Sequence, residues 1–335
     1  MVYSPPSPPT WGVLGAARIA HEQVVPAIRR AGAGEVLGVS SASGRADSFA
    51  DALDIERPYA THQALLSDPD IEVVYVALPN SLHAPWILRS VESGKHVLCE
   101  KPIVLDARDL DRIADAATTS GVVVGEAFMY RHHAQLQMIR DVIAGGDIGE
   151  VCALHARLHF ALERTPQPDI RLLPDLGGGA LWDLGCYPVD FFGAILSREP
   201  DQVVAVDSRD EEGGVFTHVA ASLRYGSVTA GLDCGFDAQM VGTATVVGSA
   251  GSVSVTDLFR SDLVGDVGTV IVESGSDRRS LAVGSDQYAE QAAAFARQVR
   301  RGTPDPAAWD HSARTTRTLA RIDTTLHAGD RHSER

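Results

Sequence analysis

A lysine and a glutamate stand at the end of a short apolar stretch and could carry acid–base chemistry. Residues 96–102 run from an apolar centre into Glu100, Lys101 and Pro102. Pro102 must end the strand, because proline has no N–H to donate to a sheet ladder. Since open α/β sheets bind ligands at the carboxyl ends of their strands, we place Lys101 at the centre of the chemistry. The alternative is a pair of surface charges in an ordinary turn.

A carboxylate and a phenol form a second candidate pair in the glycine-rich segment 177–192. If this segment is helical, Asp183 and Tyr187 lie four residues apart on one face and can act as an acid and a base. Pro188 would disturb the turn before it, and the glycines at 177–179 would let a ligand approach the backbone closely. The alternative is a buried helix in which Tyr187 donates to a carbonyl and Asp183 caps locally.

Alternating strands and helices must position Lys101. Apolar stretches at 11–15, 35–40, 73–78 and 122–127 predict buried strands, and amphipathic patterns between them predict helices. This alternation predicts a parallel sheet with right-handed crossovers, so we expect an N-terminal Rossmann domain over residues 11–127. Residues 1–10 carry four prolines and are expected to be a disordered leader.

The turn after the first strand is typical of a dinucleotide-binding site. Gly15 occupies the first position of the glycine pattern, and Ala17 and Ala20 replace the other two glycines. Alanine is small enough for a close approach of phosphate, provided that its φ is not positive. Backbone amides at the following helix N-terminus would bind the pyrophosphate. The candidate cofactor-binding residues of this turn are Gly15, Ala16, Ala17, Arg18 and Ile19.

Two further turns are expected beside it. The second strand ends without a carboxylate to bind the ribose 2′-hydroxyl, so serine hydroxyls and Arg45 could hold a 2′-phosphate, and we expect NADP, with NAD as the alternative. Arg45 could instead merely begin the next helix. After the third strand, a turn precedes a helix over about 83–93. The candidate cofactor-binding residues of these turns are Ser40, Ser41, Ser43, Arg45, Leu78, Pro79, Asn80 and His83.

The second half of the chain predicts a different architecture. Seven strands between residues 151 and 272 follow one another with few helices, and many alternate polar with apolar residues, as in an antiparallel sheet with one covered face. Helices are expected at about 134–144, 287–301 and 311–328. We therefore expect an α+β domain over residues 128–328 with a large, mostly antiparallel open sheet, followed by a frayed tail at 329–335.

Composition excludes several classes of partner and site. The formal net charge of −15 is unfavourable for binding nucleic acids or anionic membranes, and no stretch is long and apolar enough for a membrane span. The four cysteines are scattered, which favours thiols in a reducing compartment such as the cytoplasm. His132 and His133 are adjacent and would point to different sides, so we expect no metal site.

Together these motifs resemble the glucose-fructose oxidoreductase, inositol dehydrogenase and MocA family of nicotinamide-dependent oxidoreductases, from about Trp11 to the closing helices. The resemblance implies action on CH–OH groups of sugars, cyclitols or diols, and a homodimer or homotetramer formed through the C-terminal sheet. It implies that Glu100 lies near the nicotinamide ribose, that Lys101 is catalytic and that the bond before Pro102 is cis.

Tyr187 stands where many members of that family have histidine. This departure resembles the branch that contains dimeric dihydrodiol dehydrogenase and sugar 3-ketoreductases, and it implies that Tyr130, Arg131 and Arg171 border the substrate. Free tyrosine has a pKa near 10, which a lysine cation within about 4–6 Å would lower. Lys101 would then orient the substrate oxygen while Tyr187 exchanges the proton, or the two roles could be swapped. Asp183 would bind a substrate hydroxyl.

Two alternatives remain at this stage. A nucleotide-sugar (dTDP-keto-hexose) ketoreductase would need cations for the diphosphate, for which Arg131, Arg157, Arg164 and Arg171 are candidates. A cofactor-sensing regulator would keep the fold and lack turnover. The presence of both Lys101 and Tyr187 argues against the regulator.

Overall fold

A computed structural model of the chain describes residues 7–163, 165, 169–210 and 214–333, and side chains as far as residue 328. The predicted leader therefore lies mostly outside the described residues, as does Arg164. The chain forms two compact units, and each is described by itself. The first comprises residues 1–104, 108–129 and 288–309, and the second comprises 105–107, 130–287 and 310–335.

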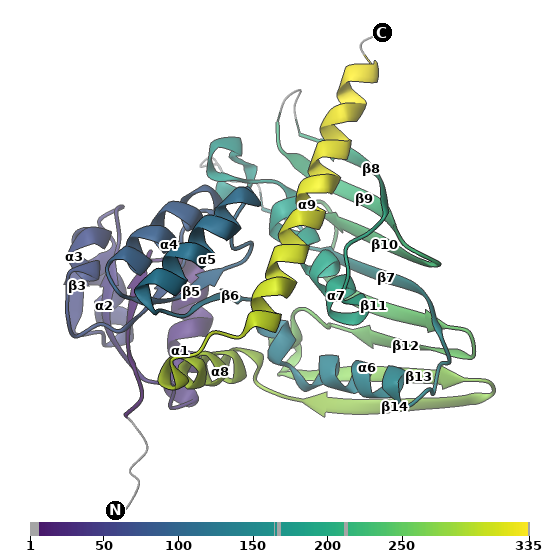
Figure 1. Cartoon of the computed structure of the whole chain (residues 1–335), viewed down its shortest axis with the longest axis horizontal. Helices are drawn as coiled ribbons and strands as arrows, with labels where there is room; N and C mark the ends of the chain where they lie inside the picture. Colours follow the sequence, from purple (N-terminus) through teal and green to yellow (C-terminus); the bar gives the residue numbers. More distant parts are fainter. Residues whose placement is uncertain (1–6, 164, 166–168, 211–213, 334–335) are drawn as a thin grey trace, which may run out of the picture. The chain divides into compact units, whose positions relative to one another are not determined.

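The first unit is built on a six-stranded parallel sheet, which confirms the predicted Rossmann architecture (Figure 1). The strand order places a topological switch point between β1 and β4, where such sheets bind ligands. The strands form because their apolar residues are buried on both faces; Val97, Leu98 and Cys99 in β5 are at most 2% exposed. In spatial order they are β3 (Arg57–Tyr59), β2 (Glu35–Ser40), β1 (Thr10–Leu14), β4 (Val73–Val76), β5 (His96–Glu100) and β6 (Val124–Ala127).

Short helices connect these strands. β3 and α3 are too short to show a hydrophobic period, and the sequence did not predict them. A π-helical turn at Ala20–Val24 opens the first helix. The helices are α1 (Val25–Arg30), α2 (Ala46–Leu53), α3 (His62–Leu66), α4 (His83–Glu92) and α5 (Arg108–Ser120).

Helix α8 (Gln287–Arg301) completes the first unit, although it lies late in the sequence. The Phe295 ring lies 5.8 Å from that of Trp11 in β1, and the Arg300 guanidinium donates two bonds of 3.0 Å to the Glu72 carboxylate. These contacts explain why the division of the chain differs from the predicted boundaries of 11–127 and 128–328. An amphipathic period shows that a helix has an apolar face, but not which sheet that face covers.

The second unit contains the predicted open sheet, with eight strands. All neighbours are antiparallel except β7 and β10, which run parallel. The sequence did not predict β14, because its residues are mostly exposed and polar. In spatial order the strands are β14 (Asp277–Gly284), β13 (Val267–Ser274), β12 (Gly251–Thr256), β11 (Val241–Gly248), β7 (Val151–His159), β10 (Val228–Gly235), β9 (Phe216–Tyr225) and β8 (Gln202–Arg209).

Helices cover one face of this sheet, namely α6 (Ala134–Ala144), α7 (Cys186–Leu196) and α9 (Pro306–Ser333) (Figure 1). In β7, Leu154, Ala156 and Leu158 point to the helices, while His155 and Arg157 point away. Helix α9 continues to Ser333, into the segment 329–335 that is predicted to be a frayed tail. No proline interrupts the backbone ladder after Pro306. Within the described residues, no helix has both the length and the apolarity needed to cross a bilayer.

Candidate active site

The carboxyl end of β5 holds the predicted glutamate and lysine. The Tyr75 hydroxyl of β4 donates to the Glu100 carboxylate, and the bond between Lys101 and Pro102 is cis, as the resemblance implied. The amide of Ile103 donates to the Glu126 carboxylate of β6 over 2.9 Å. Tyr75 was not among the predicted site residues, and its signal in the sequence was a single hydroxyl in an otherwise aliphatic strand. Strands on both sides of β5 therefore hold the segment that carries Lys101.

Only two lysines occur in the sequence, and they have different surroundings. Lys95 is 6% exposed, and its ammonium donates to the backbone carbonyls of Asp68 and Ile71 over 2.6 and 2.7 Å. Burial lowers the pKa of Lys95. These bonds give Lys95 a structural role before β5 begins. Lys101 is only half-buried at the carboxyl end of the same strand, where a ligand can reach it.

His83 links the loop that follows β4 to the loop that follows β5. Its Nδ1 lies 2.8 Å from the Pro102 carbonyl and its Nε2 lies 2.8 Å from the Leu78 carbonyl. Burial and the Lys101 cation lower the pKa of His83, so the neutral ring donates to one carbonyl at a time. The side chain is fully buried. We therefore interpret His83 as a positioning residue for Lys101, and its direct contact with a cofactor stays a prediction.

The turn between β1 and the helix that begins at Arg18 has the backbone of a close-approach loop. Gly15 has a φ of +104°, and a Cβ there would lie 2.3 Å from the Ala77 carbonyl oxygen. Its amide donates to the Ser40 carbonyl over 2.9 Å. Only glycine allows the backbone to turn this close to the end of β4. The residues present therefore fit the loop that lies against the phosphates of a dinucleotide. Ala16 is buried, whereas the Arg18 side chain is 80% exposed and Ile19 is half-buried.

We expect Gly15→Val to weaken NADPH binding by at least about tenfold, because the new side chain strains the backbone and collides with Ala77. Fluorescence titration with NADPH measures the change. The matched control is Gly32→Ala, since Gly32 also has a positive φ, of +57°, but no atom lies within 4 Å of the added Cβ. Equal binding by Gly15→Val and the wild type would contradict the assignment of this loop.

The predicted serine cluster after β2 is only partly assembled for a ligand. The Ser40 hydroxyl is fully buried, 2.8 Å from His62 Nδ1, and its contact with the cofactor stays a prediction. Ser41 and Ser43 hydroxyl oxygens lie 2.9 Å apart, and Arg45 Nε donates to the Ser43 hydroxyl over 2.9 Å. Two hydroxyls and one cation therefore meet after the end of β2. After β4, Asn80 begins a 3-10 turn at Asn80–Leu82.

The second candidate pair lies in the second unit, where a π-helical turn at Leu181–Gly185 leads into α7. The segment 177–192, considered as a possible helix, is therefore helical from Leu181 onward, with a π-helical first part and a regular α-helix from Cys186. A proline clashes with the carbonyl four residues earlier, and Pro188 places that conflict within the π-helical turn. Arg171 Nε donates to the Asp183 carboxylate over 2.8 Å, so two predicted substrate-binding residues do come together. The charge of Asp183 raises the pKa of Arg171.

Tyr187 is in an aromatic cluster at the start of α7. Its ring centroid lies 5.5 Å from Phe259 and 6.1 Å from Tyr130, and the residue is 5% exposed. Aromatic neighbours at these distances restrict the orientation of the phenol ring. Lys101 belongs to the first unit and Tyr187 to the second, so their meeting stays a prediction.

Tyr130 and Arg131 form part of a buried network around Asp190 of α7. The Tyr130 hydroxyl and the Arg131 guanidinium both donate to its carboxylate, as does the Thr315 hydroxyl, over 3.0 Å. His311 Nε2 lies 3.1 Å from the same carboxylate. These bonds give Tyr130 and Arg131 a structural role, and their contacts to substrate stay a prediction. The only sequence signal for Asp190 was its place about one turn after Tyr187.

Comparison with known proteins gives two family matches. Residues 10–128 match the family described as "Oxidoreductase family, NAD-binding Rossmann fold", and residues 136–254 match the "GFO/IDH/MocA C-terminal domain". The two matches correspond to the two kinds of sheet seen in the structure.

Individual relatives span almost the whole chain. The D-xylose 1-dehydrogenase (NADP(+)) 2 of Haloferax volcanii is 31% identical, over 95% of this chain and 98% of that protein. The dTDP-3,4-didehydro-2,6-dideoxy-α-D-glucose 3-reductase of Actinomadura kijaniata is 33% identical, over 90% of each. The crystal structure of KijD10, a 3-ketoreductase from Actinomadura kijaniata in complex with NADP and TDP-benzene, has a TM-score of 0.88 at 30% identity, covering 95% of this chain and 98% of that chain.

Proposed function

The chain belongs to the GFO/IDH/MocA family of oxidoreductases, and from this premise we propose that it transfers hydride between NADP and a carbonyl or secondary alcohol of a sugar, cyclitol or diol. The observation that carries the proposal is the position of Lys101. It follows the strand next to β4 at the carboxyl edge of a Rossmann sheet, while the only other lysine is bonded to backbone carbonyls.

Different side chains of the first unit would bind different parts of the cofactor. The Gly15 turn and the helix after it suit the pyrophosphate, and Ser41, Ser43 and Arg45 suit the 2′-phosphate of the adenosine ribose. Glu100, supported by Tyr75, would accept from a ribose hydroxyl near the nicotinamide. When bound, the dinucleotide supplies or accepts the hydride.

Proton transfer is the task of the protein's own residues. As an alcohol is oxidised, its hydroxyl proton must leave with the hydride, and as a carbonyl is reduced, the forming alkoxide must receive a proton. Lys101 would hold the reacting oxygen and Tyr187 would exchange the proton, with the lysine cation favouring the phenolate. Asp183, oriented by Arg171, would accept from a second hydroxyl of the substrate.

The preference for NADP has a direct test at Arg45. We expect Arg45→Ala to raise the dissociation constant for NADPH by about 10- to 100-fold, because a charge-assisted bond to phosphate contributes about 1.5–3 kcal/mol, and to leave NADH binding nearly unchanged. Isothermal titration with each cofactor measures this. Arg112→Ala is the control, since Arg112 pairs only with nearby Asp109 on α5 and is 66% exposed. A parallel loss of both cofactors would contradict a 2′-phosphate site.

Turnover itself is tested with both reduced dinucleotides and a panel of keto sugars, diketones and inosose-type ketones. We expect oxidation of NADPH with at least one of them. Dinucleotide binding without turnover on any compound, in either direction, would favour the cofactor-sensing regulator instead.

A nucleotide-sugar ketoreductase is the second candidate, because reductases of dTDP-linked keto sugars recur among the relatives. Arg171 could offer a cation to a diphosphate, since it is 32% exposed beside Asp183. Arg157 is not suited to this task, because it projects from the outer face of the sheet, where its Nε donates to Thr243. Competition binding with dTDP and with a free hexose distinguishes the two substrate classes.

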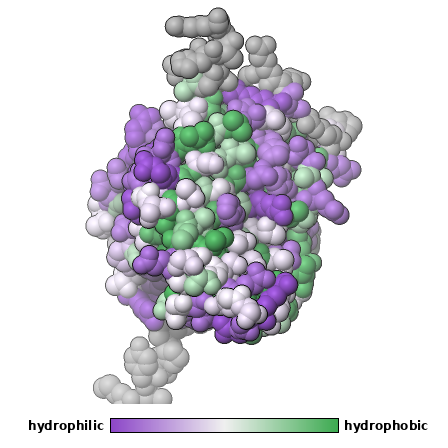
Figure 2. Space-filling model, turned by 90° about the vertical axis from the view of Figure 1, so that its right-hand side faces the viewer, coloured by the Kyte–Doolittle hydropathy of each residue, from purple (hydrophilic) through white to green (hydrophobic). Residues whose placement is uncertain are grey.

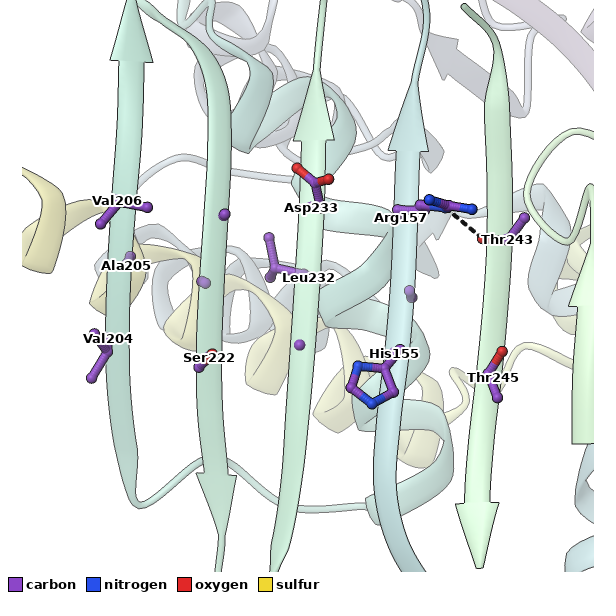
Figure 3. A pocket seen from close by; sticks show the side chains of 14 residues that line it. His155, Arg157, Val204, Ala205, Val206, Ser222, Leu232, Asp233, Thr243 and Thr245 are labelled. Carbon is purple, nitrogen blue, oxygen red and sulfur yellow. Dashed lines mark hydrogen bonds between the residues drawn. The ribbon is translucent and has the colours of Figure 1, made fainter. Parts of the chain in front are cut away.

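A second copy of the chain is proposed to cover the outer face of the second-unit sheet. The described residues place no helix on this face, and Val204 and Val206 of β8 are 58% and 66% exposed there. Figure 2 shows apolar residues gathered over its centre, and Figure 3 shows Val204, Val206 and Leu232 beside polar residues that line a pocket there. Such a patch is typical of an interface. A monomer in analytical ultracentrifugation would contradict the predicted dimer or tetramer.

Cytoplasmic location stays a prediction that rests on the cysteines. Cys99, Cys152, Cys186 and Cys234 are all thiols and none is half of a disulfide. This agrees with a reducing compartment.

A further inference from the structure

A group of two histidines and one aspartate lies on the outer face of the second-unit sheet, separate from the residues assigned to hydride transfer. His159 ends β7, His218 lies near the start of β9, and Asp233 is in β10 between them. In the strand register, Gly235 of β10 is opposite both His159 and His218. Asp233 lies two residues before Gly235, so all three side chains emerge on the same face.

We propose that His159, His218 and Asp233 bind a divalent transition metal ion, for which zinc is the best fit. The possible ligand atoms of the three residues all lie within 4.8 Å of one another. Asp233 Oδ1 is 2.5 Å from His218 Nε2, and Asp233 Oδ2 is 3.4 Å from His159 Nε2. Zinc binds imidazole nitrogen and carboxylate oxygen at about 2.0–2.2 Å, so small side-chain rotations would bring all three onto one ion.

The composition of the group selects the class of ion. Two neutral imidazoles with one carboxylate suit zinc and its neighbours in the first transition row, whereas magnesium and calcium prefer oxygen ligands. Three protein ligands also leave a fourth tetrahedral position for water. Arg157 is a cation on the same face and is opposite Asp233 in the register, but its Nε donates to the Thr243 hydroxyl (Figure 3).

The surroundings of the histidines support a built site. The His159 side chain is only 7% exposed, and its Nδ1 has no hydrogen-bond partner among the described residues. His218 Nδ1 lies 3.6 Å from Asp237, and a carboxylate beside the second ring nitrogen is the usual outer partner of a metal-bound histidine. Gly235 leaves space between them, since a Cβ there would lie 2.9 Å from Asp237 Oδ1 and 3.2 Å from His159 Nδ1.

The competing account is a His218–Asp233 hydrogen bond that merely joins β9 to β10 without an ion. This account explains the His218–Asp233 pair, but it does not explain why the buried His159 ring turns its Nε2 toward the same carboxylate, 3.4 Å from Asp233 Oδ2. The proposal also departs from the expectation of no metal site, which considered only residues close together in the sequence. His159 and His218 are brought together only by the pairing of β7, β10 and β9.

The test is zinc binding by the full-length protein after removal of metals with EDTA and dialysis. Isothermal titration with ZnCl₂ is expected to give one ion per chain. His218→Gln or Asp233→Asn is expected to lower the affinity for zinc by more than about 100-fold, which exceeds the effect of losing an outer partner of a metal ligand. The matched control is His155→Gln, because His155 lies on the same strand and face as His159 but outside the group. It should bind zinc like the wild type.

Cobalt supplies a second readout that needs no variant to fold. Co²⁺ added to the wild type should give the visible absorption of a four-coordinate nitrogen and oxygen site, which equimolar zinc removes. The proposal is overturned if zinc binding is not saturable, if His155→Gln weakens it as much as His218→Gln, or if cobalt gives only the pale spectrum of the hydrated ion.

Discussion

Replacing Lys101 with methionine is expected to lower turnover by at least about 10²- to 10⁴-fold while NADPH binding changes little. Methionine keeps the length of the side chain but cannot donate to the reacting oxygen or stabilise a phenolate. Steady-state rates on the substrate identified in the panel, combined with a fluorescence titration of NADPH, separate the chemical role from cofactor binding. Undiminished turnover would remove Lys101 from the mechanism.

The two lysines provide their own control. Lys95→Met removes two bonds to backbone carbonyls, so it should lower the free energy of unfolding by about 1–3 kcal/mol and leave the turnover of the folded enzyme close to that of the wild type. If both variants lose turnover only in proportion to the loss of folded protein, the role of Lys101 is structural, like that of Lys95.

Tyr187→Phe tests the proposed proton-exchanging residue, which belongs to the second unit. If Tyr187 exchanges the proton, its loss should lower the maximal rate by about 10²-fold or more and abolish the alkaline limb of the pH–rate profile. Tyr225→Phe is the control, because Tyr225 ends β9 and is 3% exposed. If Tyr187→Phe keeps the wild-type profile, the proton is carried by another group.

Replacing Asp190 with asparagine is expected to lower the free energy of unfolding by about 3–5 kcal/mol at neutral pH, because the Arg131 cation would remain buried without its counter-charge. Burial by itself raises the pKa of Asp190, but Arg131 and His311 outweigh it, and the folded-state pKa lies far below the ordinary value. Urea unfolding followed by circular dichroism measures the loss. A midpoint equal to that of the wild type would contradict the structural role.

The lowered pKa of Asp190 also determines how its contribution to the free energy of unfolding depends on pH. A carboxylate whose pKa is depressed by folding contributes its full stability above the unfolded value of about 3.9, and this contribution is lost as the pH falls below it. The difference between wild type and Asp190→Asn should therefore be constant from neutral pH to about pH 5 and shrink below about pH 4. Glu199→Gln is the control, because its exposed pair with Arg317 should cost less than about 1 kcal/mol.

Local sequence patterns were sufficient to predict both sheets and the end of β5. The run Val73–Val76 and the segment ending at Pro102 carry their structure in apolar residues and one imino acid, whose effects do not depend on distant parts of the chain. The predicted phosphate turn depended in the same way on Gly15, whose positive φ excludes other residues.

What the sequence could not show depends on contacts between distant residues. Nothing near Ser40 indicated that its hydroxyl would be bonded to His62, and nothing near Arg131 indicated Asp190, which is 59 residues away. The π-helical turn before Pro188 shows a further limit. A proline predicts a disturbance, but the way the chain absorbs it depends on how the segment packs.

The return of α8 to the first unit affects how the protein is made. The N-terminal strands leave the ribosome long before Phe295 is made. The apolar surface around Trp11 of β1, which α8 later covers, therefore stays exposed during most of synthesis. A fragment that stops at residue 129 would expose this apolar surface and should aggregate, whereas the same fragment joined by a short linker to residues 288–309 should remain monomeric. Completion of the nucleotide-binding half is thereby coupled to the arrival of residues 288–309, within the last seventh of the polypeptide.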